Sequence, residues 1–168
     1  MSSFIHGKDQ VCKWIRAHFP RDSSILDVGA CDGAWQYRLQ EYKNIDAVEA
    51  FEPNLKHLKH YRNVYHADIR GFEYENYDLI IFGDVVEHMS VGEAQAMLNY
   101  AWPRCKDMIV VVPFKFRQGM IYNNPYEIHV QDDLTDKLFN ERYPGFEVLC
   151  RPIMNYCYYH KPGVFDNG

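Results

Sequence analysis

The segment Ile25–Gly33 constrains the fold more than any other part of the chain. It reads Ile-Leu-Asp-Val-Gly-Ala-Cys-Asp-Gly, a short apolar strand that ends in an acidic, glycine-containing turn, and a helical pattern follows from Ala34 to about Tyr42. In an open α/β sheet, ligands bind outside the carboxyl ends of the strands, where the first strand turns into its helix. Glycines permit the tight turn and the close approach of a ligand, and the start of the helix offers free N–H groups. The segment therefore predicts an α/β sheet with a ligand site at this turn.

Composition narrows the class of protein. The chain has 168 residues and 47% hydrophobic residues, which suffices for one domain with a sizeable core. Its net charge of −5 gives no support for a broad nucleic-acid-binding face. The five cysteines include no CxxC pair, which favours free thiols in a reducing compartment. There is no apolar leader at the start and no apolar run long enough to span a membrane. We expect a single domain over residues 1–168, located in the cytoplasm and not in a membrane.

Strand and helix patterns alternate along the chain. Apolar runs predict strands over residues 25–28, about 45–48, 63–66, 77–82, 108–112, 146–150 and about 155–160. Helices are predicted over residues 8–19 within the N-terminal segment 1–20, over 34 to about 42, after Pro53, after the capping box Ser90-x-x-Glu93, and from 132 or 133 to about 143. This alternation predicts a doubly wound α/β fold, a mostly parallel sheet with helices on both faces. The last two strands are expected to form a hairpin at the sheet edge.

Two motifs resemble a known family. Asp27-Val-Gly29-Ala-Cys31-Asp-Gly33 resembles motif I of the class I S-adenosylmethionine (AdoMet)-dependent methyltransferases, with Cys31 in place of the middle glycine. Tyr77–Met89 resembles their motif IV, especially in the small-molecule branch, which carries an aspartate, two apolar residues and Glu-His. The dinucleotide fingerprint G-x-G-x-x-G is absent. The resemblance extends over nearly the whole chain. It implies a Rossmann-like fold of seven strands with an antiparallel last strand, AdoMet as cofactor, and methyl transfer to an O, N, S or C nucleophile.

The resemblance also implies which residues contact AdoMet. The first turn supplies Asp27, Gly29, Ala30 and Gly33, and the backbone at Gly83 is expected to face the methionine part of the cofactor. After the third strand, the resemblance assigns Asp68 as the acceptor for the adenine amino group. Ile69 follows it and is expected to supply a backbone N–H.

Two acids compete for the ribose, because a carboxylate after the second strand can accept hydrogen bonds from both ribose hydroxyls. They are Glu49 and Glu52, in the sequence Val-Glu-Ala-Phe-Glu-Pro. We favour Glu49, since a strand that extended to Glu52 would leave Glu49 inside it as a desolvated, unpaired charge. Glu52 remains the alternative, because Phe-Glu-Pro-Asn resembles an acid-proline version of the motif.

Three residues are candidates for a catalytic base: His88, His129 and Asp84, in that order. Histidine can accept a proton near neutral pH. His88 and Asp84 follow the fourth strand, and His129 lies in the long loop 114–131, which is expected to lie on the substrate side. The alternative readings are structural: a Glu-His pair that supports the turn, and a packed surface loop.

The sequence indicates the class of methyl acceptor less directly than it indicates the cofactor. We expect a small molecule, because no broad basic face is indicated. A nucleic-acid acceptor stays possible if Lys115, Arg117 and the segment Lys56–Arg62 form a basic patch beside the cleft. A non-catalytic AdoMet-binding protein would be favoured if loop 114–131 filled the cleft, and a nicotinamide oxidoreductase is disfavoured by the glycine spacing. No HExxH motif or Cys/His ligand spacing occurs, so no metal site is predicted.

Overall fold

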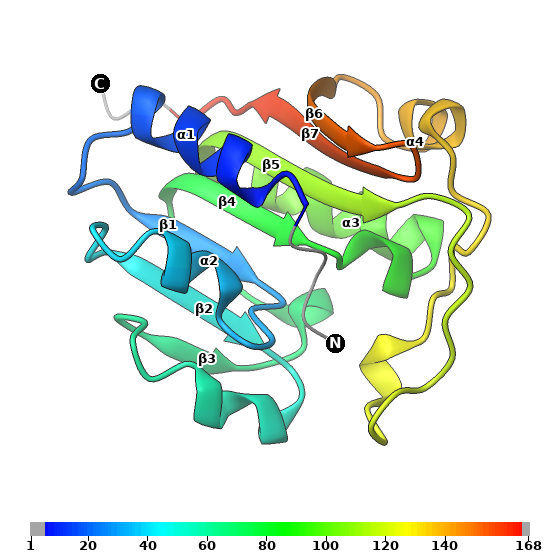
Figure 1. Ribbon diagram of the computed structural model, residues 1–168, viewed down its shortest axis with the longest axis horizontal. Coiled ribbons are helices and arrows are strands. Elements are labelled where there is room, and N and C mark those ends of the chain that lie inside the picture. Colours follow the sequence, from blue (N-terminus) through cyan, green and yellow to red (C-terminus); the bar gives the residue numbers. More distant parts are fainter. Residues whose placement is uncertain (1–5, 166–168) are drawn as a thin grey trace.

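The computed structural model describes residues 6–165. Within this range, seven strands form one sheet in the order β3-β2-β1-β4-β5-β7-β6 (Figure 1). The strands are β1 (Ile25–Val28), β2 (Ile45–Glu49), β3 (Val64–His66), β4 (Tyr77–Gly83), β5 (Cys105–Pro113), β6 (Glu147–Ile153) and β7 (Tyr156–Pro162). Strands β1 to β5 pair in parallel, whereas β7 is antiparallel to both β5 and β6. The predicted seven-stranded sheet with an antiparallel last strand is confirmed, as is the closing hairpin.

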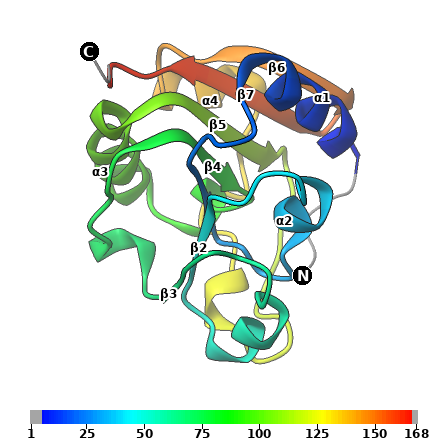
Figure 2. The same ribbon diagram turned by 90° about the vertical axis from the view of Figure 1, so that its left-hand side faces the viewer.

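Helices cover both faces of this sheet (Figure 2). Helices α1 (Lys8–His18) and α2 (Ala34–Arg38) pack on one face, where their apolar side chains join one buried cluster. Helices α3 (Val91–Ala101) and α4 (Asp136–Arg142) pack on the other face in a second cluster. The doubly wound arrangement is therefore confirmed. No helix in residues 6–165 is long and apolar enough to cross a membrane.

Helix α3 begins as the sequence predicts. The Ser90 hydroxyl accepts a hydrogen bond from the Glu93 N–H, and the Glu93 carboxylate accepts one from the Ser90 N–H. This reciprocal pair satisfies two N–H groups that the helix itself leaves free. The predicted capping box is confirmed.

Three helices differ from the predicted bounds, each for a local reason. Helix α2 ends at Arg38, whose carbonyl accepts a hydrogen bond from the Arg16 guanidinium. The segment after the second strand is a 3₁₀ helix, Glu52–His57, rather than an α-helix. Helix α4 is capped by Thr135 and not by an earlier aspartate, because the Asp133 carboxylate is paired with Arg142.

Strand β1 buries an acid in the centre of the sheet. Asp27 is almost fully buried, and its carboxylate accepts a hydrogen bond from the Tyr61 hydroxyl. Burial raises the pKa of Asp27 to about 7, because the ionised form loses its hydration. The raised pKa of Asp27 therefore makes the stability of the folded chain depend on pH.

We predict that Asp27→Asn changes how stability depends on pH. The pKa of Asp27 is raised from 3.8 to about 7 in the folded chain, so the folded state binds the proton more tightly than the unfolded state. This contribution to stability is fully present below about pH 4 and is lost as the pH rises to about 7, by on the order of 4 kcal/mol at most. Urea unfolding across this range should show the wild type losing stability relative to the variant. A difference that does not vary with pH would contradict the prediction.

Candidate functional site

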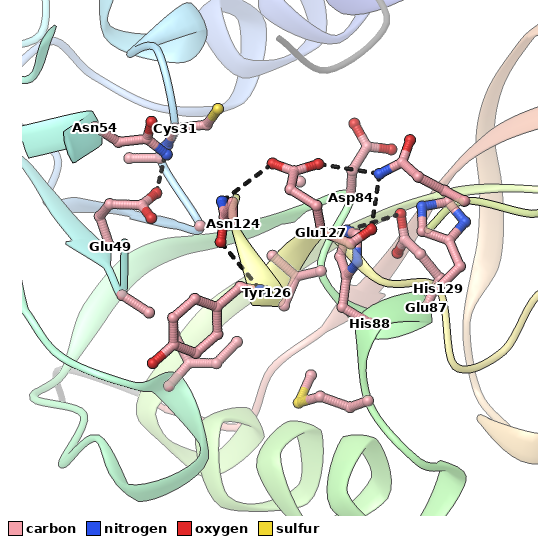
Figure 3. A pocket seen from close by; sticks show the side chains of 18 of the residues that line it. Cys31, Glu49, Asn54, Asp84, Glu87, His88, Asn124, Tyr126, Glu127 and His129 are labelled. Carbon is pink, nitrogen blue, oxygen red and sulfur yellow. Dashed lines mark hydrogen bonds and ion pairs between the residues drawn. The ribbon is translucent and has the colours of Figure 1, made fainter. Parts of the chain in front are cut away.

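A pocket lies at the carboxyl edge of the parallel strands, where the turns after β1, β2, β3 and β4 meet loop 114–131. Figure 3 shows Cys31 and Glu49 at one end of it and Glu87, His88 and His129 at the other. The topology explains this convergence, because parallel strands deliver their carboxyl ends to one edge of the sheet. The pocket is therefore built from segments that are far apart in the sequence.

The turn after β1 forms one wall of the pocket. Gly29 adopts a left-handed conformation with a φ of +72°, and a Cβ atom there would lie 2.5 Å from the Cγ2 atom of Val85. A side chain at Gly29 is thus excluded both by its backbone conformation and by the turn after β4. Cys31, at the position of the missing motif glycine, also has a positive φ of 50°.

Glu49 is the last residue of β2, and its side chain lines the pocket while only 6% exposed. Its carboxylate accepts hydrogen bonds from the N–H groups of Cys31 and Phe51, each at 2.8 Å. Each carboxylate oxygen retains a lone pair for a further donor. Glu52 begins the following 3₁₀ helix, is exposed, and is not among the pocket-lining residues.

The turn after β3 contains a pairing that the sequence did not suggest. Asp68, Ile69 and Arg70 all line the pocket. The Asp68 carboxylate accepts hydrogen bonds from the backbone N–H of Arg70 at 3.0 Å and from its guanidinium at 2.9 Å. This pairing lowers the pKa of Asp68. Arg70 therefore occupies the acceptor atoms that the resemblance assigns to an adenine amino group.

Two buried donors lie beside the turn after β4. The indole N–H of Trp35, a pocket-lining residue, lies 3.0 Å from the point where a Cβ of Gly83 would be, and has no hydrogen-bond partner among the described residues. The Lys8 ammonium lies 4.4 Å from the Trp35 ring centroid and also lacks such a partner there. Burial lowers the pKa of Lys8, whereas the nearby charges of Asp84 and Asp27 act in the opposite direction. A buried hydrogen-bond donor without a partner is costly. This region is therefore suited to a ligand group that accepts hydrogen bonds.

Asp84 follows β4 and lines the pocket in a left-handed conformation, with a φ of +56°. The hydroxyl of Tyr156 lies 2.6 Å from each oxygen of its carboxylate. Tyr156 is the first residue of β7, and it reaches this edge because β7 runs antiparallel to its neighbours. The tyrosine therefore orients a carboxylate that a strained backbone has already placed at the pocket.

The two predicted histidines are adjacent in the folded chain. The ring centroids of His88 and His129 lie 4.7 Å apart, and both side chains line the pocket. Burial lowers the pKa of His88 to about 4, and the neighbouring His129 adds to the effect. Burial also lowers the pKa of His129. Both imidazoles are therefore neutral near pH 7.

Glu87 lies beside these rings and was not among the predicted site residues. Its side chain is 1% exposed, and neither carboxylate oxygen has a hydrogen-bond partner among the described residues. Its Oε1 lies 3.9 Å from Nε2 of His88. Burial and the nearby Asp84 raise the pKa of Glu87 well above its ordinary value.

Loop 114–131 lines the pocket rather than filling it. Gln118, Asn124 and Glu127 contact one another across the loop, with the Gln118 amide donating to the Glu127 carboxylate at 3.0 Å. At its far end, the buried Gln131 amide donates to the carbonyls of Val86 and Met89. This anchor fixes the end of the loop against the turn that carries Glu87 and His88.

The charged lining of the pocket is mainly acidic. The acidic lining residues are Glu49, Asp68, Asp84, Glu87 and Glu127. Among the described residues that line the pocket, Arg70 supplies the guanidinium group, and no lysine is present. Lys115 and Arg117 are exposed and do not line the pocket, and Arg117 is 92% exposed. These two basic residues belong to the loop that lines the pocket but are not themselves lining residues.

Most of the residues predicted for the site come together in it. The pocket is lined by Gly29, Ala30, Glu49, Asp68, Ile69, Gly83, Asp84, His88 and His129. Asp27 and Gly33 are not among the lining residues: Asp27 is buried beneath the first turn, and Gly33 precedes α2. The sequence did not predict a place in the site for five further lining residues, Trp35, Arg70, Glu87, Glu127 and Tyr156. Of these, Glu87 had a signal, because it precedes the histidine of the Glu-His pair that was singled out.

Comparison with known proteins gives structural matches only. No family model and no curated protein matches the chain. Among solved structures, the methyltransferase domain of a bacterial CtHen1 is 17% identical, with a TM-score of 0.66 over 92% of this chain and 96% of that one. An S-adenosylmethionine-dependent methyltransferase from Clostridium acetobutylicum ATCC 824 is 12% identical, with a TM-score of 0.70 over 93% of this chain and 90% of that one.

A third match carries the cofactor. The magnesium protoporphyrin IX methyltransferase of Synechocystis PCC 6803, with bound S-adenosylmethionine, is 17% identical, with a TM-score of 0.61 over 91% of this chain and 76% of that one. The strand order and the antiparallel β7 described above agree with these matches. The chain has the Rossmann-like fold of the class I S-adenosylmethionine-dependent methyltransferases.

Proposed function

We propose that this protein is an AdoMet-dependent methyltransferase that acts on a small-molecule acceptor. The observation that carries the proposal is the Glu49 carboxylate, which is held by two backbone N–H groups at one end of a pocket whose wall includes Gly29. An acid fixed in this way suits the ribose hydroxyls, and the absent side chain at Gly29 lets the turn after β1 pack directly against Val85 of the turn after β4. The fold supports the same reading by analogy.

The donors and acceptors of the pocket fit the parts of AdoMet. Glu49 would accept from the ribose, and the backbone at Gly29 and Gly83 would face the methionine part. The unpartnered Trp35 N–H suits the methionine carboxylate, and the buried ammonium of Lys8 adds a positive charge behind it. The adenine would lie toward Ile69, where Arg70 must share or release Asp68 for the amino group to bind.

When bound, AdoMet supplies a methyl group activated by a positively charged sulfur: an acceptor lone pair forms the new bond to carbon, the S–C bond breaks with its electrons passing to sulfur, and an acceptor proton leaves to a base or to solvent. The main task of the chain is to align the reactants, which can contribute roughly 7–11 kcal/mol. Acidic side chains at the pocket favour the cationic cofactor over the neutral product. We keep His88, His129 and Asp84 as the side chains that face the acceptor.

Two observations favour this function over the alternatives. Loop 114–131 leaves the pocket open beside His88, which supports an acceptor site rather than a purely cofactor-binding protein. The acidic lining disfavours a polyanionic acceptor, since its phosphates would meet like charges. Calorimetry with AdoMet and with NAD is the first experiment. Binding of AdoMet is expected, whereas binding of NAD alone would refute the proposal.

We predict that Gly29→Ala abolishes AdoMet binding and destabilises the fold. The new methyl group would lie 2.5 Å from Val85, which costs about 1–3 kcal/mol by overpacking, and the left-handed backbone costs about 1–2 kcal/mol more. Gly92→Ala is the matched control, because nothing lies within 4 Å of a Cβ there. Adding Val85→Ala should recover part of the lost stability. Wild-type affinity in folded Gly29→Ala would show that this turn does not hold the cofactor.

We predict that Glu49→Gln weakens AdoMet binding at least about tenfold, whereas Glu52→Gln has little effect. Hydrogen bonds to a charged acceptor contribute about 1.5–3 kcal/mol each, and 1.4 kcal/mol corresponds to a factor of ten. The two variants make the same chemical change, and Glu52 is exposed and outside the pocket. Calorimetric titration of both proteins measures the effect. A larger loss for Glu52→Gln would reverse the assignment.

A further inference from the structure

Three metal-ligating side chains meet at the acceptor end of the pocket. One ligand atom from each of Glu87, His88 and His129 lies within 4.8 Å of the others. Glu87 and His88 follow β4, whereas His129 comes from the far end of loop 114–131. The fold therefore brings together three side chains that no local spacing in the sequence identifies as metal ligands. The expectation that the chain has no metal site was based on local spacing alone.

Both imidazoles are oriented by backbone carbonyls. Nδ1 of His88 lies 3.2 Å from the carbonyl oxygen of Ile128, and Nδ1 of His129 lies 2.6 Å from that of Phe116. A carbonyl oxygen only accepts, so each Nδ1 carries the hydrogen. The lone pair of each neutral ring is then on Nε2. This arrangement, with the outer nitrogen bound to a carbonyl, is the one that orients histidines at metal sites.

Glu87 supplies the independent observation. Its carboxylate is 1% exposed, lines the pocket, and has no hydrogen-bond partner among residues 6–165. Hydrogen bonds or a cation normally compensate a buried carboxylate, because its desolvation is costly. The pocket-lining acids Asp84 and Glu127 add negative charge at this end of the pocket. The local charge therefore favours a cation beside Glu87.

The distances come close to what one ion requires. Ligands at about 2.0–2.2 Å from a metal lie at most roughly 4.0–4.4 Å from one another. The Glu87 Oε1 and His88 Nε2 atoms are already 3.9 Å apart. Two ligands of a tetrahedral ion lie roughly 3.3–3.6 Å apart, so the widest separation in the cluster, up to 4.8 Å, must close by more than about 1 Å when an ion binds.

We infer that Glu87, His88 and His129 bind a divalent transition-metal ion. Two imidazole nitrogens and one carboxylate oxygen suit zinc, iron or cobalt, whereas magnesium and calcium prefer oxygen ligands. Three protein ligands leave coordination positions open toward the pocket. If the proposed methyltransferase function holds, these positions suit an acceptor hydroxyl, whose pKa the cation lowers so that its proton leaves to solvent before the oxygen takes the methyl group.

A cobalt titration tests the site directly. Co²⁺ is added to the full chain after treatment with a chelator, and its visible absorption is followed. One equivalent is expected to bind without thiolate charge-transfer bands, to be displaced by Zn²⁺, and to be unaffected by excess Mg²⁺. Glu87→Gln and His129→Ala should each weaken binding at least about tenfold, since even the partners of metal ligands are worth roughly 10–100-fold.

Three controls keep the test decisive. His60→Ala removes an exposed histidine outside the pocket and should leave Co²⁺ binding unchanged. Cys31→Ser replaces the thiol of a pocket-lining cysteine and should also leave Co²⁺ binding unchanged. Thermal unfolding checks that each variant is folded, and if Glu87→Gln does not fold, His129→Ala in the loop carries the test. Absence of stoichiometric binding, or binding that survives in folded His129→Ala, would overturn the inference.

Failure of this inference is distinguishable from failure of the proposed function. AdoMet binding is measured by calorimetry in the presence of a chelator, so it does not require the ion. A chain that binds AdoMet but no Co²⁺ refutes the metal site and leaves the methyltransferase proposal intact. A chain that binds Co²⁺ at these residues but no AdoMet supports the metal site and refutes the proposed function.

Discussion

The close approach of two turns, after β1 and after β4, determines the shape of the site. The strands pair in register, with Val28 opposite Phe82, so the residues that follow them arrive side by side. Val85 then lies so near Gly29 that no side chain fits between the turns. The pairing of the two central strands therefore fixes where both turns begin. The ligand-facing groups after β2 and β3 are placed relative to these turns.

Local patterns were sufficient to predict the strands and the mostly parallel sheet, whereas the antiparallel last strand was expected from the resemblance to methyltransferases. Strands β1 and β4 are short apolar runs bounded by a glycine, the pattern typical of buried parallel strands. The same logic placed Glu49 at a strand end, where the structure has it. Helix ends were less predictable, since the last carbonyl of α2 accepts a hydrogen bond from Arg16 of the neighbouring helix α1. The segment 132–136 contains several residues that can cap the N-terminus of α4. Asp133 does not cap it, because its carboxylate is paired with Arg142.

The site residues that were not predicted depend on the folded structure around them rather than on a local sequence pattern. Arg70 binds Asp68 two residues away, yet only the turn geometry makes that pairing possible. Trp35 reads as a core residue of a helix, and only the packing against Gly83 brings its N–H to the pocket. Glu87 stands in the Glu-His pair, but its burial is not visible in the sequence, and the backbone of the loop end hydrogen-bonds to its carbonyl. These groups retain unpaired or competing polar atoms, a cost that stability alone would not select.

The position of β7 has a consequence for how the protein is made. The Tyr156 hydroxyl donates its one hydrogen to the Asp84 carboxylate, shared between the two oxygens, and Tyr156 belongs to a strand inserted between β5 and β6. A growing chain folds from its N-terminus as it is synthesised, so β1 to β5 can associate before Tyr156 exists. During that interval Asp84 lacks this hydrogen bond, and β5 exposes the edge that β7 will later cover. The last hairpin therefore makes assembly of the pocket a late event and leaves the nascent sheet exposed to edge-to-edge association until it forms.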